Sequence, residues 1–168
     1  QRAAHALGEL KSMEALDELI AAVKDPNADV RQYAIQALSQ LESTRALPAF
    51  LSALSDANVD VRQQAMSAIS DLEGLDRAPR EVLAALNDEN ADMRQQTLQT
   101  LAHIKDPASV SAIIPLTRTG QPLPVREAAV EALGEIGGPQ IEAVLLELIK
   151  DPDPKIRRIA AQGLGRDK

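Results

Sequence analysis

The sequence contains no cysteine and no tryptophan, and tyrosine and phenylalanine each occur only once among its 168 residues. Without cysteine the chain can form neither a disulfide framework nor a thiolate zinc site. Because aromatic side chains are almost absent, any hydrophobic core must be built from alanine, leucine, isoleucine and valine. The sequence therefore indicates a fold held together by aliphatic packing.

An excess of positive charge is also lacking, since 18 Lys and Arg residues face 25 Asp and Glu residues for a net charge of −7. Binding to a phosphate backbone depends on clustered Lys and Arg, so nucleic acid is not expected as a partner. No apolar run approaches the ~18 residues that cross a bilayer, and no signal peptide is visible. Direct membrane insertion is not expected, and the cytoplasm is favoured although composition does not identify the compartment.

What the sequence does contain is a repeat, of which the segment from Asp25 to Leu41 is the clearest copy. Each copy carries an arginine preceded by an apolar residue, and successive arginines are 31, 32, 32 and 31 residues apart, at positions Arg31, Arg62, Arg94, Arg126 and Arg157. A fixed period in this range indicates a repeat array rather than a single globular core. Helices of about 12 residues are marginal alone in water, so stacking between repeats must stabilise them.

Apolar residues at helical spacing predict two helices per repeat, here called A and B, with short loops between them. The predicted pairs are Ser12 or Met13–Lys24 with Val30–Leu41, Thr44–Ser55 with Asp60–Leu72, Arg77–Asn87 with Asp92–Ile104, Pro107–Arg118 with Pro124–Ile136, and Pro139–Lys150 with Pro154–Leu164. Asp29 is expected to cap the first B helix. The predicted fold is one all-α domain, a right-handed α-solenoid of about five repeats (11–41, 42–72, 73–104, 105–136 and 137–168) after a half repeat over 1–10. Because the first repeat is incomplete, we expect the chain to be a piece of a longer polypeptide.

The pattern D-x4-V-R-x2-A-x2-A-L-x2-[LI] resembles the HEAT-repeat family, in particular the short bacterial units associated with phycobilisome lyase subunits. The resemblance covers almost the whole chain and implies an α-solenoid whose B helices line the concave side. It also implies an Asp–Arg ladder between neighbouring repeats, whose members here are Asp25, Arg31, Asp56, Arg62, Asp88, Arg94, Arg126, Asp151 and Arg157. An anion-binding row of arginines is the alternative role for these cations.

The fourth repeat departs from the others, because Gly120 or Thr119, depending on where a one-residue insertion is placed, stands where the other repeats have Asp. Pro124 also replaces the Asp found at 29, 60 and 92. Pro115 falls inside the preceding A helix, where it removes a backbone hydrogen bond and predicts a kink or an early end. Two hypotheses remain open for residues 115–124: a softer joint in the array, or sequence variation in a loop without consequence.

The B-helix positions that remain after the core is assigned form one polar, glutamine-rich face. Its candidate partner-binding residues are Gln32, Tyr33, Gln36, Gln63, Gln64, Gln95, Gln96, Gln99, Glu127 and Glu131. Tyr33 is the one aromatic residue on this face, and aromatic residues are over-represented among interface hot spots. A solvated helix face is the alternative, and for Glu127 the alternatives are a cross-repeat ion pair with Arg158 or docking of a basic partner segment.

No residue pattern indicates catalysis or a cofactor. His5 and His103 lie three repeats apart, roughly 25–30 Å, and cannot share a metal ion. Deoxyhypusine hydroxylase resembles a HEAT array too, but its iron requires His-Glu pairs that these two histidines do not have. The sequence predicts a non-catalytic interaction or scaffolding module that binds a protein or peptide, with a bilin lyase-type subunit or a passive spacer as alternatives. The apolar ends around Leu7 and Leu164 also predict possible end-to-end self-association.

Overall fold

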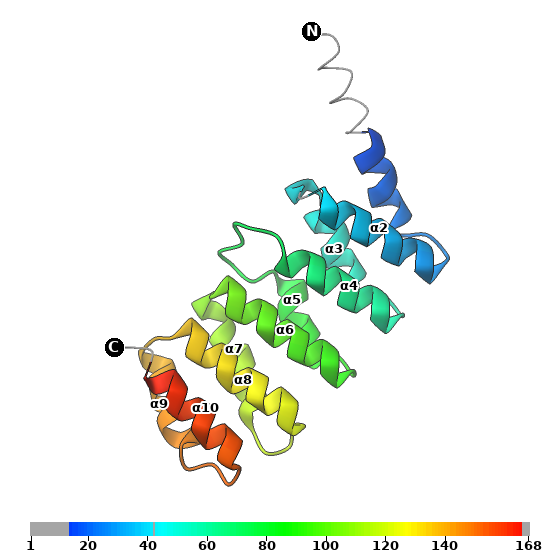
Figure 1. Ribbon diagram of the computed structural model, residues 1–168. Helices are drawn as coiled ribbons and strands as arrows, with labels where there is room; N and C mark the ends of the chain where they lie inside the picture. Colours follow the sequence, from blue (N-terminus) through cyan, green and yellow to red (C-terminus); the bar gives the residue numbers. More distant parts are fainter. Residues whose placement is uncertain (1–13, 42, 166–168) are drawn as a thin grey trace. The chain divides into compact units, whose positions relative to one another are not determined.

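The computed structural model describes residues 14–41 and 43–165. The chain divides into two compact units, residues 1–72 and residues 73–168, which are described separately below. The described residues are helices joined by short loops and contain no strand (Figure 1). The expected half repeat over 1–10, the apolar end around Leu7 and His5 lie outside the described residues.

The first unit is a stack of helix pairs built on an aliphatic core. Its described elements are a helix over residues 14–22, α2 (Ala28–Gln40), the 3-10 turn η1 (Thr44–Ala46) that continues into α3 (Leu47–Ala53), and α4 (Val59–Ser70). The B helices α2 and α4 pack on one another, and α3 packs on α4 (Figure 1). The largest fully buried side chains of this unit are Ile35, Leu38, Phe50, Met66 and Ile69.

The second unit repeats this arrangement three times. Its elements are α5 (Arg80–Ala84) with η2 (Ala85–Asn87), α6 (Ala91–Ile104), η3 (Pro107–Ser109) with α7 (Val110–Ile113) and η4 (Ile114–Thr117), α8 (Leu123–Ile136), α9 (Pro139–Leu148) and α10 (Pro154–Leu164). The B helices α6, α8 and α10 form one layer, with α6 packed on α8 and α8 packed on α10 (Figure 1). The A elements lie behind this layer, and the core between the two layers buries Val82, Leu98, Leu101, Ile113, Leu133, Ile141 and Leu145.

The A helices are shorter and less regular than the sequence predicts. The third one begins at Arg80 rather than at Arg77, directly after Pro79. In the fourth repeat, α7 has 4 residues and then tightens into the 3-10 turn η4, which contains Pro115. Proline has no N–H for an α-helical hydrogen bond, so the expected early end takes the form of a change from α to 3-10 geometry.

The B helices α2, α4, α6 and α8 begin one or two residues earlier than expected, whereas α10 begins at Pro154 as predicted. Asparagine rather than aspartate caps α2, α4 and α6. Asn27 accepts hydrogen bonds from the backbone N–H groups of Asp29 and Val30, so the expectation that Asp29 is the cap was wrong. Asn58 caps α4 and Asn90 caps α6 in the same way. An amide oxygen four residues before Arg31, Arg62 and Arg94 thus satisfies free N–H groups of the first helical turn.

The apolar position before the arginine is buried in four of the five described B helices and partly exposed in the first. Val61, Met93, Val125 and Ile156 are fully buried at the position before the arginine, whereas Val30 is 40% exposed at the same position. The described residues leave this side of α2 partly uncovered.

Candidate functional site

Three side chains fold the loop between the A and B helices of the first repeat. The carboxylate Oδ1 of Asp25 accepts the backbone N–H of Asn27 at 2.8 Å. Asn27 Oδ1 then accepts the N–H groups of Asp29 at 2.7 Å and Val30 at 3.4 Å. Arg31 Nη1 closes the loop by donating to the carbonyl oxygens of Asp25 at 2.8 Å and Pro26 at 3.2 Å.

The same loop recurs in three further repeats, with a short polar side chain four residues before the arginine. Its members are Asp56, Asn58 and Arg62; Asp88, Asn90 and Arg94; and Asp151, Asp153 and Arg157. The sequence analysis missed this position, although Asn27, Asn58, Asn90 and Asp153 share it. Within a repeat, the arginine therefore binds the carbonyl of the Asp six residues earlier and not its carboxylate.

Two ladder arginines, Arg31 and Arg126, each meet a carboxylate that belongs to the following repeat. Arg31 Nη2 donates to Asp56 Oδ1 at 2.8 Å, and Arg31 Nε lies 2.7 Å from Oδ2 in an ion pair whose N–H is not aligned for a hydrogen bond. In the second unit, Arg126 Nη2 donates to Asp151 Oδ2, and both side chains are only 8% exposed. These ion pairs connect neighbouring repeats within each unit.

Asp56 titrates below its usual range because of this environment. Burial alone raises the pKa of Asp56. The hydrogen bonds from Arg31 and the Asn58 N–H, together with the positive charges of Arg31 and Arg62, outweigh burial and lower the pKa. The carboxylate is therefore ionised at neutral pH.

Two ladder arginines depart from this pattern around the fourth repeat. The position four residues before Arg126 is Pro122, where the other repeats have a capping Asn or Asp. Arg126 Nε donates instead to the carbonyl of Thr117 at 2.9 Å. Arg94 binds its own loop carbonyls but meets no carboxylate among the described residues. The remaining ladder arginines differ in exposure, because Arg62 is buried and Arg157 is exposed.

The candidate partner-binding residues of the first unit lie on the two B helices. Tyr33 is 71% exposed on α2, Gln36 beside it is exposed, and Gln32 is half-buried. Gln63 and Gln64 are half-buried on α4. The hollow of this unit that Arg31 and Asp56 line contains none of these five residues.

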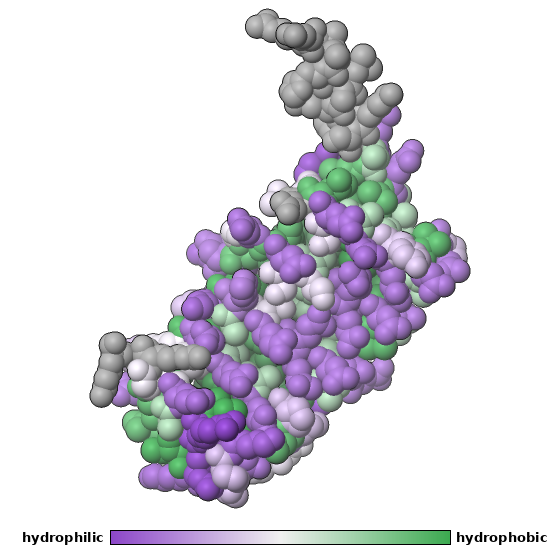
Figure 2. Space-filling model, viewed as in Figure 1, coloured by the Kyte–Doolittle hydropathy of each residue, from purple (hydrophilic) through white to green (hydrophobic). Residues whose placement is uncertain are grey.

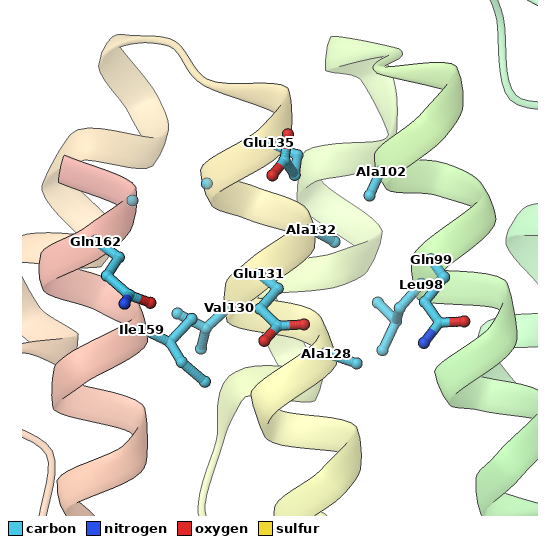
Figure 3. Close-up of a pocket in the computed structure, with 12 residues that line it drawn as sticks. Leu98, Gln99, Ala102, Ala128, Val130, Glu131, Ala132, Glu135, Ile159 and Gln162 are labelled. Carbon is cyan, nitrogen blue, oxygen red and sulfur yellow. The ribbon is translucent and has the colours of Figure 1, made fainter. Parts of the chain in front are cut away.

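In the second unit, two of the predicted residues meet in a groove of about 290 Å³ between α6, α8 and α10 (Figure 3). Gln99 on α6 and Glu131 on α8 line it, whereas Gln95, Gln96 and Glu127 do not. Figure 2 shows a mainly hydrophilic surface on this side of the molecule, with apolar residues between the polar ones. The apolar part of the groove consists of Leu98, Ala102, Ala128, Val130, Ala132 and Ile159.

Two glycines also line the groove, and the sequence analysis did not single them out as site residues. Gly134 in α8 and Gly163 in α10 face each other so closely that a Cβ on Gly134 would lie 3.1 Å from the Cα of Gly163. Their positions inside helices were the available signal, since glycine there costs stability relative to alanine and usually has a packing reason.

The charge of the groove is negative. Glu135 lies 3.8 Å from Lys105, and Glu127, outside the groove, lies 3.3 Å from Lys155. The expected pairing of Glu127 with Arg158 was therefore wrong, because Lys155 at the start of α10 is the cation that reaches it. Glu131 is exposed and forms no ion pair or hydrogen bond with any residue that the structure describes.

Other kinds of site are not found in the described part of the chain. No three His, Asp or Glu side chains in residues 14–41 and 43–165 gather closely enough to hold a metal ion. Within the same ranges, no helix has both the length and the hydropathy needed to cross a membrane.

Solved structures with the same fold have diverse roles. The complex of CpcE and CpcF of phycocyanin lyase from Nostoc sp. aligns with a TM-score of 0.70 and 22% identity over 89% of this chain and 63% of that chain. Human deoxyhypusine hydroxylase aligns with a TM-score of 0.63 and 22% identity, covering 95% of this chain and 64% of that chain. A designed armadillo repeat protein in complex with the peptide (KR)4 aligns with a TM-score of 0.66 and 16% identity, covering 96% of this chain and 85% of that chain.

These similarities establish the fold alone, and the chain spans less than two thirds of the length of the lyase and hydroxylase chains. The predicted all-α solenoid is confirmed by the stacked helix pairs and by the similarity to these solved structures. Comparison with curated proteins gave no significant match. A sequence model of HEAT repeats matches residues 1–70 and 79–165, and the chain therefore belongs to the HEAT-repeat family.

Proposed function

We propose that this protein is a non-catalytic interaction module that binds a basic segment of a partner polypeptide in the groove between α6, α8 and α10. The observation that carries the proposal is the Glu131 carboxylate, which is exposed above an apolar surface and has no partner among the described residues. A Lys or Arg side chain suits this site, because its charged end can meet Glu131 while its aliphatic stem covers apolar atoms.

The rim of the groove supports binding of an extended chain. Gln99 lies on one side of Glu131 and Gln162 on the other (Figure 3). A primary amide offers both donors and an acceptor, so these two side chains can bind the backbone of a segment that crosses the B helices. The net charge of −7 favours a basic partner at longer range. The designed relative in complex with (KR)4 supports this use of the fold.

The alternative of a bilin lyase-type subunit rests on the similarity to the CpcE and CpcF complex. A tetrapyrrole site requires an extended apolar or aromatic lining. The groove contains no aromatic residue and presents Gln99, Glu131, Glu135 and Gln162. Its lining therefore favours a polypeptide ligand over a bilin.

Fluorescence anisotropy with a labelled peptide of alternating Lys and Leu tests the proposal, with a Glu and Leu peptide as the opposite-charge probe. We expect binding of the basic peptide only, and Glu131→Gln should weaken it about tenfold. Glu147→Gln on the exposed side of α9 makes the same change in net charge outside the groove and should leave the affinity unchanged. Equal losses in both variants would show a nonspecific charge effect, and absence of binding would favour a passive spacer.

The exposed face of α2 is a separate candidate surface for the same partner. Tyr33 and Gln36 are exposed there without being needed for the core. If this face contributes, Tyr33→Ala with Gln36→Ala should weaken the basic peptide's binding without changing the thermal transition. An unchanged affinity would restrict the proposed site to the second unit.

A further inference from the structure

Arg94 is a ladder arginine whose carboxylate is missing. Its Nη1 donates to the carbonyl oxygens of Asp88 at 2.6 Å and Glu89 at 3.1 Å, which fixes the guanidinium against its own loop. Its Nε is buried and donates to no group in the described part of the chain. The same ranges contain no acidic side chain that forms an ion pair with Arg94. The cation is thus held in place with part of its hydrogen-bonding capacity unused.

The cause of this difference is visible in the sequence. The residue 25 positions after Arg31 is Asp56, and the residue 25 positions after Arg126 is Asp151. The residue 25 positions after Arg94 is Thr119, which is exposed in the loop between η4 and α8. The repeat that should supply the acid to Arg94 is therefore the one whose loop is altered.

A hollow exists where that acid would otherwise lie. In the first unit, the corresponding hollow has a volume of about 300 Å³ and is lined by both Arg31 and Asp56. Beside Arg94 the hollow is about 580 Å³. Six lining positions match between the two at equal distances from the arginine: Val23, Lys24, Asp25, Arg31, Ser52 and Ala53 in the first, and Leu86, Asn87, Asp88, Arg94, Pro115 and Leu116 in the second.

The walls of the larger hollow are mixed in character. Leu83, Leu86, Pro115 and Leu116 supply apolar surface around Arg94, and Gln121 supplies an amide. Asp88 also lines the hollow, but its Oδ1 accepts the Asn90 N–H of its own loop at 2.9 Å, and Arg94 contacts the Asp88 carbonyl instead. The hollow therefore presents a fixed guanidinium between aliphatic side chains.

We propose that this hollow is a binding site for a carboxylate group carried by a partner polypeptide. A guanidinium binds a carboxylate through two parallel N–H groups, which gives both charge pairing and direction. Guanidinium–carboxylate ion pairs of Arg31 with Asp56 and of Arg126 with Asp151 already occur in the structure, each with a hydrogen bond from Nη2. The partner's acid takes the place of the Asp that the fourth repeat lacks. This site selects an acidic group and lies outside the groove proposed above, which selects a basic one.

The side-chain Nε–Hε signals of arginine in ¹⁵N-resolved NMR spectra test this proposal on the unmodified chain. Titration with sodium acetate at constant ionic strength should shift the Arg94 signal saturably. Arg31 and Arg126 should not respond, because each already contacts an aspartate. Arg157, which is exposed and bound to loop carbonyls like Arg94, reports the response of an arginine without a hollow. A shift of Arg94 no larger than that of Arg157, or an equal shift with sodium chloride, overturns the proposal.

Three peptides then distinguish the source of the carboxylate: acetyl-Leu-Asp-Leu amide, acetyl-Leu-Asn-Leu free acid, and acetyl-Leu-Asn-Leu amide. We expect the Arg94 signal to respond to the first if the site takes an acidic side chain and to the second if it takes a chain terminus. The neutral third peptide should have no effect, and a response to it equal to the others contradicts a carboxylate site. Arg94→Gln should weaken binding of the acidic peptide about tenfold. Arg157→Gln makes the same change in charge and should leave the affinity for this peptide unchanged.

Discussion

Gly134 and Gly163 bring helices α8 and α10 to a separation that no larger residue would permit at this crossing. A Cβ on Gly134 would lie 3.1 Å from Gly163 Cα, and a Cβ on Gly163 would lie 2.9 Å from a methyl group of Leu145. The contact is made by backbone on one side, so it cannot be relieved by rotation of a side chain. The close approach sets the spacing of the two helices that form one half of the groove.

Gly134→Ala is therefore expected to destabilise the protein despite the better helix propensity of alanine. Overpacking at a tight contact costs about 1–3 kcal/mol, which exceeds the propensity gain of about 1 kcal/mol. Gly120→Ala is the matched control, because a Cβ there meets nothing within 4 Å. Urea denaturation should give a lower midpoint for Gly134→Ala and an unchanged or slightly higher one for Gly120→Ala. Equal midpoints would mean that the helices are further apart than described.

The lowered pKa of Asp56 predicts how the stability of the first unit depends on pH. Its folded pKa lies below the ordinary value of 3.8, so the carboxylate stabilises the fold fully above that value. The contribution is lost as the pH falls from there through the lower folded pKa. Asp56→Asn should cost about 1–2 kcal/mol at neutral pH, and its difference from the natural sequence should close in acid.

Asp25→Asn is the control for this experiment. Asp25 accepts the Asn27 N–H as Asp56 accepts the Asn58 N–H, but no arginine of the described chain binds its carboxylate. Urea unfolding of the three proteins between neutral pH and about pH 3 measures the effect. A constant difference between Asp56→Asn and the natural protein at every pH would contradict the lowered pKa.

Substitution of the buried ion pair in the second unit should cost more stability than substitution elsewhere in the ladder. Arg126 and Asp151 are both 8% exposed, so removal of the arginine leaves a buried, uncompensated carboxylate. Arg126→Gln is expected to cost about 3–5 kcal/mol in urea unfolding. Arg157→Gln removes an exposed arginine whose partners among the described residues are loop carbonyls, and should cost below about 1 kcal/mol.

A second substitution separates loss of the pair from general damage to the fold. Adding Asp151→Asn to Arg126→Gln removes the stranded charge and should restore part of the lost stability. No recovery in the double variant would place the cost elsewhere, such as in the lost hydrogen bond to the Thr117 carbonyl.

The sequence predicts the helix pairs and most of the core because both depend on local apolar spacing. The B helices begin within two residues of their expected starts, and Val61, Met93, Val125 and Ile156 are buried as the pattern requires. The ladder partners were harder to assign, since Arg31 reaches an acid 25 residues away while its own Asp25 offers only a carbonyl. That choice depends on how repeats stack and not on spacing within one repeat.

The candidate groove was predictable only in part for the same reason. Gln99 and Glu131 follow from their positions on the polar face of the B helices, and both line the groove. The contribution of Gly134 and Gly163 arises from a contact between two helices and has no counterpart in the repeat pattern. Likewise, Lys155 rather than Arg158 meets Glu127, because side-chain reach across the helices, not equivalence of position, determines the pair.

We expect the segment around Pro115 to be the part of the second unit that opens most easily. The 3-10 turn η4 has 4 residues, and the loop residues Arg118, Thr119 and Gly120 that follow it are all exposed. Such segments open with a low free energy because few buried contacts are lost. Amide hydrogen exchange should therefore be faster over 114–121 than over 141–148 in α9, which lies in the same layer of A elements. Equal protection in the two ranges would exclude a soft joint.

Arg126 connects the end of η4 to α8, because its Nε donates a hydrogen bond to the Thr117 carbonyl. If that hydrogen bond limits opening, Arg126→Lys should accelerate exchange over 114–121 more than over α9, because a lysine ammonium lacks the planar fork that holds Thr117 and Asp151 together. Arg118→Lys, at an exposed position in the adjacent loop, makes the same chemical change without that contact and should leave exchange unaltered. Equal acceleration in both variants would show that the joint is governed by the proline and not by the arginine.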